Sequence, residues 1–199
     1  DVIEWVESHN GVDFDCKLQI AKHDGDAKKI FLVIPGVDGS LDGFENKYLR
    51  IAQNVNREFG QTAYQMDNPF ISRLHWESNI RQMLDYIHME HPEIDSVYIM
   101  AHSAGAWVIG NIAHGYPEIK KLLLVNPASN VDLDEFEKSI ETNKHSEIIF
   151  LIGSEDPSHE HKGRFQKENT KVILVDGADH HFSGNHLPHF ISSPTKYLY

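Results

Sequence analysis

The sequence predicts an α/β fold built on a mostly parallel sheet, and three observations support this prediction. Short runs typical of strands alternate along the chain with longer segments of helical spacing. The run Ile30–Pro35 is continuously apolar, as expected of a strand that is buried on both faces. The first two candidate strands instead alternate apolar and polar residues, which is typical of an antiparallel edge pair with one solvated face. Alternation of strands with helices predicts parallel strands joined by right-handed crossovers.

The expected elements follow one another without an internal repeat or a low-complexity linker. The eight expected strands are Val2–Glu7, Phe14–His23, Ile30–Pro35, Gln61–Met66, Ser96–Met100, Lys120–Asn126, Glu147–Ile152 and Lys171–Val175. Helical spacing of apolar residues favours a helix over Phe44–Phe59, which Gly60 ends. The other expected helical segments are Arg73–Glu90, Ala104–His114, the acidic segment Asp132–Thr142, a helical turn at Gly163–Glu168 and Leu187–Leu198.

The segment Tyr98–Trp107 combines a strand-like apolar run with a small-x-Ser-x-small turn that opens a helix. A serine on such a turn is held in a strained backbone conformation that exposes its Oγ above the edge of the sheet. Ala101 and Gly105 are the small neighbours that let the strand and the helix pack closely around Ser103. Ser103 is therefore a candidate nucleophile on a nucleophile elbow. On the local motif alone, Ser103 could equally be the N-cap of the helix.

An activated serine needs a base within hydrogen-bond reach and an acid that orients the base. The apolar run after Glu147 ends in Gly-x-x-Asp-Pro, which places Asp156 just past the carboxyl end of a strand. The next run ends in Gly-x-x-His-x-Phe and delivers His180 to the same edge of the sheet. Asp156 is the candidate acid and His180 the candidate base. Glu155 is the nearest alternative acid, and His181 the nearest alternative base.

A glycine-rich loop follows the strand Ile30–Pro35 at the position where a hydrolase needs backbone donors for the tetrahedral oxyanion. Gly36 allows a sharp turn there, so the N–H of Val37 is expected to point into the site. The N–H of Ala104, the residue after the nucleophile, is the expected second donor.

With these four parts in place, the chain resembles the α/β-hydrolase family over nearly all of its length. The chain order Ser103, Asp156, His180 is the order of that family. The resemblance implies a twisted, mostly parallel eight-stranded sheet with helices on both faces. Only about one helix separates the sixth strand from the acid strand, so we expect no cap domain and a small, capless serine hydrolase. The chain departs from the usual pattern with Ala101 in place of Gly and Pro35-Gly36 in place of His-Gly.

His159 and His161 lie close together on an acidic segment and raise the question of a metal site. Their spacing is not that of a zinc enzyme, so we expect solvated side chains, no metal and no cofactor. His102 precedes the nucleophile and is expected to point away from it, in a structural role.

Length and composition predict one domain over residues 1–199. The formal net charge of -12 argues against nucleic acid or an anionic membrane as a partner. No apolar stretch is long enough for a membrane span, and the first residues given, Asp-Val-Ile-Glu-Trp, lack the basic-then-apolar pattern of a secretion signal. A single cysteine, Cys16, allows no internal disulfide and favours a cytoplasmic location. Because the chain begins with Asp1 instead of Met, the native amino terminus is not visible in the sequence.

The expected function is hydrolysis of a small carboxylic ester, thioester or related acyl compound through an acyl-enzyme on Ser103. An acyltransferase or amidase with the same triad is the alternative within the same chemistry. A non-catalytic binding protein on the same fold is the alternative of a different class, because a fold does not fix a function. The expected partner is a small-molecule acyl substrate, and the oligomeric state is left open.

Overall fold

A single sheet runs through the computed structural model, which describes residues 1–69 and 76–199. Within these residues the sheet has eight strands in the order β1-β2-β4-β3-β5-β6-β7-β8. The strands are β1 (Val2–His9), β2 (Val12–His23), β3 (Asp26–Ile34), β4 (Gln61–Met66), β5 (Ser96–His102), β6 (Ile119–Val125), β7 (Glu147–Gly153) and β8 (Thr170–Val175). β1 pairs antiparallel with β2 and β2 antiparallel with β4, whereas all other pairs are parallel. The predicted mostly parallel sheet with an antiparallel edge pair is confirmed.

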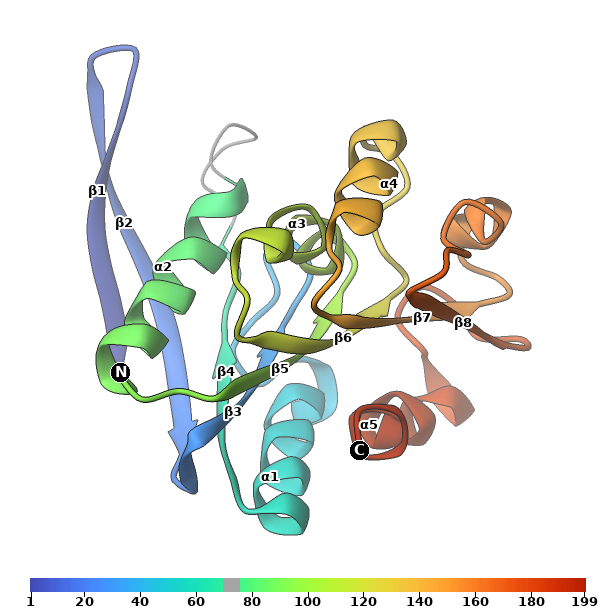
Figure 1. Ribbon diagram of the computed structural model, residues 1–199, viewed down its shortest axis with the longest axis horizontal. Coiled ribbons are helices and arrows are strands. Elements are labelled where there is room, and N and C mark those ends of the chain that lie inside the picture. The colour runs from blue at the N-terminus through green and yellow to red at the C-terminus, as the bar shows by residue number, and fades with distance from the viewer. Residues whose placement is uncertain (70–75) are drawn as a thin grey trace.

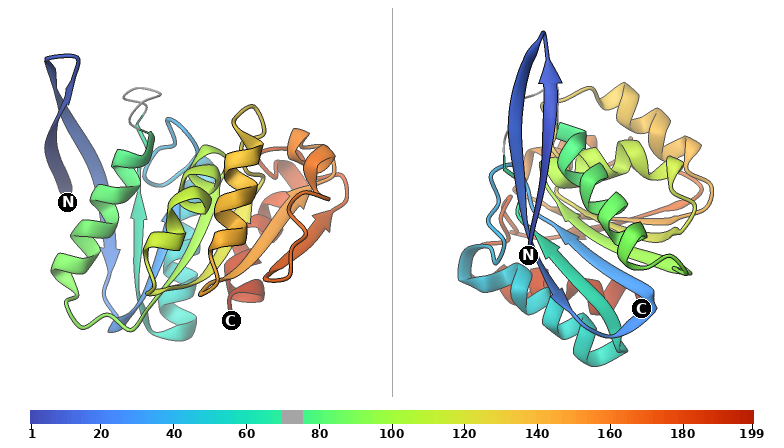
Figure 2. Two further views of the ribbon diagram at one scale, coloured as in Figure 1. Left: turned by 45° about the horizontal axis from the view of Figure 1, so that its top comes forward. Right: turned by 90° about the vertical axis from the view of Figure 1, so that its left-hand side faces the viewer.

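Helices cover both faces of the sheet, as Figure 1 shows. They are α1 (Lys47–Phe59), α2 (Trp76–Glu90), α3 (Ala104–Ile112), α4 (Leu133–Thr142) and α5 (Leu187–Tyr197). One face carries α1 and α5, and the other carries α2, α3 and α4. The hairpin of β1 and β2 extends beyond the helices, which is clearest in Figure 2.

The apolar side chains of the parallel strands alternate between two cores, one under each helical layer. Leu32, Ile99 and Leu124 belong to the core beneath α2, α3 and α4. Val33 and Met100 belong to the core beneath α1 and α5. Because the strand side chains point alternately to opposite faces, one continuous apolar run fills both cores. The carboxyl ends of the strands are thereby held as one rigid edge.

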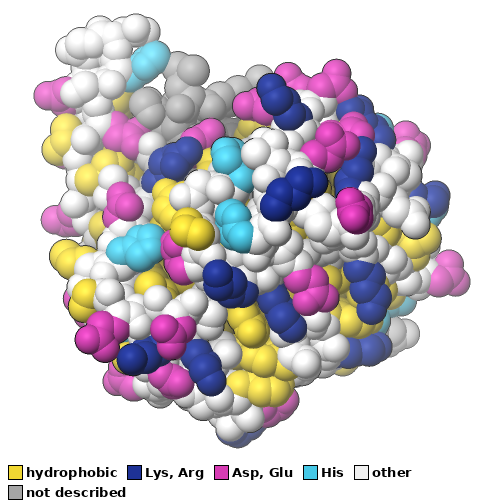
Figure 3. All heavy atoms as spheres, in the orientation of Figure 1, with side chains coloured by type: hydrophobic (Ala, Val, Ile, Leu, Met, Phe, Trp, Pro, Cys, Tyr) yellow, Lys and Arg dark blue, Asp and Glu magenta, His cyan; other side chains and the backbone are white. Residues whose placement is uncertain are grey.

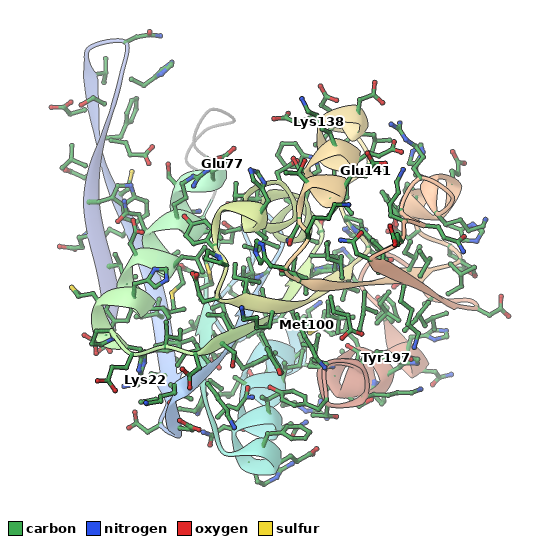
Figure 4. All side chains as sticks on the ribbon, in the orientation of Figure 1. Lys22, Glu77, Met100, Lys138, Glu141 and Tyr197 are labelled. Carbon is green, nitrogen blue, oxygen red and sulfur yellow. The ribbon has the colours of Figure 1, made fainter. Side chains whose placement is uncertain are left out.

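The helices form where the sequence places a buried stripe and a terminating residue. α1 buries Tyr48, Ile51 and Val55 on one side and ends at Gly60, which adopts the left-handed conformation with φ 66°. α4 begins after Asp132, whose side chain accepts hydrogen bonds from the backbone N–H groups of Asp134 and Glu135. The outer side of α4 is charged, and Figure 4 shows its exposed residues Lys138 and Glu141.

The segment between β6 and β7 holds α4 alone, so no cap domain is inserted there. No helix in the described part of the chain is long and apolar enough to cross a membrane. Acidic and basic side chains are intermixed over the face in Figure 3.

Two expected helical segments differ from the structure. The helical turn expected at Gly163–Glu168 is wrong, because these residues form irregular turns. A 3-10 helix lies earlier, at Pro157–His161, where Asp156 caps the N-terminus and Pro157 occupies the first turn. The helix expected over Ala104–His114 ends at Ile112 and continues as a 3-10 turn. Arg73, the expected start of the second helix, lies outside the described residues.

Candidate active site

Ser103 joins the carboxyl end of β5 to the first turn of α3 in a strained backbone conformation, with φ 56° and ψ -124°. A positive φ is unusual for a residue other than glycine and persists only where the surroundings impose it. The Ser103 N–H donates to Val125 O at 2.9 Å, and Ser103 O accepts from the N–H groups of Trp107 and Ala128. Although Ser103 occupies the N-cap position, its side chain makes no capping hydrogen bond. Its Oγ is therefore available to the loops above the sheet.

Small residues make the strained turn possible. A side chain at Gly105 would overlap the carbonyl oxygen of Pro35. A Cβ at Gly36 would lie 3.0 Å from the Cβ of Ser103. The loop after β3 and the start of α3 thus pack backbone against backbone, with Ser103 between them.

Three expected site residues, from three separate loops, form a continuous hydrogen-bonded chain. Ser103 Oγ lies 2.9 Å from His180 Nε2. On the other side of the ring, His180 Nδ1 is hydrogen-bonded to Asp156 Oδ2. Because the carboxylate only accepts, this contact places the proton on Nδ1 and leaves Nε2 as an acceptor for the serine hydroxyl.

Asp156 is a buried carboxylate, with about 4% of its surface exposed. Burial alone would raise its pKa, but the hydrogen bonds from His180 and Ser158 outweigh burial and lower it. Ser158 contributes both its backbone N–H, at 2.8 Å from Oδ1, and its hydroxyl. These donors hold Asp156 ionised and fix the direction of the oxygen that faces His180.

The two rival residues lie elsewhere. Glu155 is exposed, and its backbone N–H donates to Ala178 O at 3.0 Å, away from the imidazole. His181 is also exposed, with its ring centroid 5.1 Å from that of His180. The structure brings Ser103, His180 and Asp156 together and leaves Glu155 and His181 outside their hydrogen-bonded chain.

The loop that carries His180 is anchored by two residues that were not predicted as part of the site. Asn126, fully buried at the end of β6, donates from Nδ2 to the carbonyl oxygens of Asp179 and His180. Its Oδ1 accepts from the N–H of Gly153, at the end of β7, at 2.8 Å. One amide thus joins the acid strand to the base loop. The sequence gives one indication of this role: Asn126 is a polar residue directly after an apolar strand, and that strand lies next to the one that leads to Ser103.

His102 is the second anchor, and its expected structural role agrees with its position. Its Nε2 lies 2.8 Å from His180 O, and its Nδ1 lies 3.4 Å from the hydroxyl of Tyr48. Burial, together with the nearby charges of Lys47 and His180, lowers the pKa of His102 well below its usual value. A neutral ring that donates from Nε2 fits both partners.

The backbone donors expected for an oxyanion lie beside the serine. Val37 and Ala104 line the same cavity of about 540 Å³ as Ser103 and His180. Neither N–H donates a hydrogen bond to another residue in the described part of the chain. Both are therefore free to bind a negatively charged oxygen. A second cavity, of about 370 Å³, is also lined by Val37, Ser103 and His180.

His159 and His161 lie in the 3-10 helix after Asp156. His159 Nε2 lies 3.2 Å from Lys162 Nζ. Within residues 1–69 and 76–199, no three His, Cys, Asp or Glu side chains are grouped as metal ligands would be.

Comparison with known proteins gives similarity in structure only. No family model matches the sequence, and no curated protein matches it. Est1E from Butyrivibrio proteoclasticus superimposes with a TM-score of 0.71 at 15% identity, over 98% of this chain and 97% of that chain. Dienelactone hydrolase from Anabaena variabilis gives a TM-score of 0.70 at 13% identity, over 100% and 96%. Alpha/beta hydrolase domain-containing protein 10 from mouse gives a TM-score of 0.67 at 13% identity, over 98% of each chain. These similarities show that the predicted α/β-hydrolase fold is the fold of this chain.

If Asn126 positions the base loop, Asn126→Ala should lower kcat for 4-nitrophenyl acetate on the order of 10²-fold, because small displacements of a catalytic group are costly. Asn143→Ala is the matched control. Asn143 is also fully buried, but its Oδ1 accepts from Ser146 N, before the start of β7 and so at the opposite end of that strand from Asp156. Urea unfolding should show a loss of about 1–3 kcal/mol for both variants. Equal losses of kcat in the two variants would contradict the positioning role.

Proposed function

Because the chain has the α/β-hydrolase fold, we propose that it is a serine hydrolase of small carboxylic esters, thioesters or related acyl compounds. The observation that carries the proposal is the 2.9 Å contact between Ser103 Oγ and His180 Nε2, with His180 Nδ1 hydrogen-bonded to the buried Asp156. A nucleophile, a base and an acid in this order satisfy the geometry that acyl transfer through serine requires. The cavity of about 540 Å³ gives a small substrate access to them.

In the first half-reaction, Ser103 Oγ attacks the carbonyl carbon while His180 Nε2 accepts the hydroxyl proton. The tetrahedral intermediate collapses by breaking the bond to the leaving group, which receives that proton from His180. In the second half-reaction, His180 takes a proton from water, and the hydroxide attacks the acyl-enzyme. The bond to Ser103 Oγ then breaks as His180 returns the proton to that oxygen, so the acid is released and the serine is restored.

Two further groups stabilise the charges that develop during these steps. Asp156 holds the imidazole in the tautomer that accepts from serine and stabilises the imidazolium. The free amides of Val37 and Ala104 donate to the oxyanion, a contribution worth on the order of 10²–10³ in rate for one donor.

The names of structural neighbours agree with this class of reaction. One is a dienelactone hydrolase, and Est1E has also been observed with ferulic acid bound. At 16% identity or less, these neighbours indicate a class of chemistry and not a substrate.

A fluorophosphonate probe tests the proposed nucleophile, because it forms a covalent bond only with an activated serine. We expect one label per chain, mapped by mass spectrometry to Ser103, and none on Ser103→Ala. The exposed serine in Ser192→Ala serves as the control and should leave the labelling intact. A label on another residue, or an unlabelled folded protein, would rule out the proposed function.

Replacing each of the adjacent histidines separates the base from its neighbour. His180→Ala should lower kcat for 4-nitrophenyl acetate by about 10⁴- to 10⁶-fold, since members of a triad act as a unit. His181→Ala should cost far less, because its ring lies outside the hydrogen-bonded chain. A severe loss in His181→Ala with a mild loss in His180→Ala would reverse the assignment.

A further inference from the structure

Lys47 is a buried cation beside the candidate active site. It is the first residue of α1, and about 5% of its surface is exposed. Its Nζ lies 4.5 Å from the ring centroid of Phe190 and 5.1 Å from that of Tyr48. Among the described residues, no hydrogen-bond acceptor or carboxylate is paired with this ammonium.

An unpaired buried charge is unfavourable, and aromatic faces replace only part of the lost hydration. Burial lowers the pKa of Lys47 to about 8, while the negative charge of Asp179 acts in the opposite direction. Lys47 therefore remains mostly protonated at pH 7. No ion pair joins Asp179 to Lys47 in the described part of the chain, and Asp179 Oδ1 instead accepts from the backbone N–H groups of His181 and Ser183.

The position of Lys47 connects this charge to the reaction. Lys47 lines the cavity of about 370 Å³ that also contains Ser103, His180 and Val37. It also lines a neighbouring cavity of about 300 Å³, whose walls include Phe44, Phe182 and Leu187. A substrate bound at Ser103 can thus extend within the first cavity to the ammonium, which also faces the second cavity.

The amino end of α1 adds to the positive potential in the same cavity. Gly43, Phe44 and Lys47, at the start of this helix, line the cavity, and the side chain of Asn46 does not cap the helix. The N-terminus of a 13-residue helix carries a partial positive charge that favours an anion. Asp38, the acidic residue in the lining, is exposed and so lies at the rim.

We propose that Lys47 is a specificity-determining residue that binds a carboxylate carried by the substrate, so that the protein prefers acyl esters with a second, anionic group. This inference rests on the proposed function and narrows its substrate class. The single charge of the Lys47 ammonium matches the single charge of a carboxylate. A phosphate dianion would leave a buried negative charge without a partner.

Paired ester probes test this preference directly. The first pairs compare mono(4-nitrophenyl) succinate, glutarate and adipate with their neutral methyl esters. In these three half-esters the carboxylate is on the acyl side. A further pair compares 4-acetoxybenzoate with its neutral methyl ester. In 4-acetoxybenzoate the carboxylate is on the leaving group. For each pair, the ratio of kcat/KM for the charged and the neutral ester cancels general effects of a substitution on the triad.

In at least one pair, wild type should prefer the charged ester, and Lys47→Met should lower the ratio by about ten- to a hundred-fold, as expected for a hydrogen bond to a charged group. Lys47→Arg, which keeps the charge, should retain part of the preference. Lys120→Met is the matched control, because Lys120 is exposed and lies near the start of β6, whereas the other end of this strand lies beside Ser103. It should leave every ratio unchanged.

Ratios that Lys47→Met leaves unchanged, or a preference of wild type for the neutral ester in every pair, would overturn the inference. A second readout does not depend on turnover. In Ser103→Ala, adding Lys47→Met should weaken the binding of the charged half-ester, measured by calorimetry, by the same factor, and unchanged binding would overturn the inference. If wild type hydrolysed none of the probes and the fluorophosphonate left Ser103 unlabelled, the proposed function would be overturned. The calorimetric comparison would still decide whether Lys47 binds the carboxylate.

Discussion

The close approach of the loop after β3 to the start of α3 is the constraint on which the site depends. Gly105 lies against the carbonyl of Pro35, and Gly36 lies against the side chain of Ser103. This contact leaves room for the left-handed backbone at Ser103, which would otherwise be unfavourable. Val37 and Ala104, on the two segments that meet here, line one cavity with the serine. One packing contact therefore positions the proposed nucleophile together with its two proposed backbone donors.

The parallel strands extend this precision to the other loops. Because β5, β6, β7 and β8 end at one edge of the sheet, the acid and the base arrive from neighbouring strands without long connections. Buried polar side chains then fix the loops to that edge. Asn126 binds the ends of the acid strand and the base loop, and His102 supports the carbonyl of His180. The imidazole is held by its backbone on one side and by Asp156 on the other.

The sequence could predict those site residues that belong to a short motif just after a strand. Ser103, Asp156 and His180 each stand within a few residues of the end of a strand, and the structure places Ser103 and Asp156 within hydrogen-bond distance of His180. Asn126 and Lys47 escaped identification because their partners are distant in sequence, and a lone Asn or Lys carries no periodic signal. The 3-10 helix at Pro157–His161 could not be predicted either, because a five-residue helix is too short to show a periodic pattern of apolar residues. Helix ends were the least predictable feature, as at Ile112, because capping depends on local competition.

The central claim is that Asp156 orients His180 as the base for Ser103. The rate of 4-nitrophenyl acetate hydrolysis by Asp156→Asn, with Glu155→Gln as its matched control, tests this claim most directly. An amide at position 156 keeps the shape but can donate to Nδ1, which places the imidazole proton on the side facing the serine. The account predicts a loss of about 10⁴-fold in kcat for Asp156→Asn, and almost none for Glu155→Gln. A severe loss in Glu155→Gln, or near-normal turnover by folded Asp156→Asn, would contradict it.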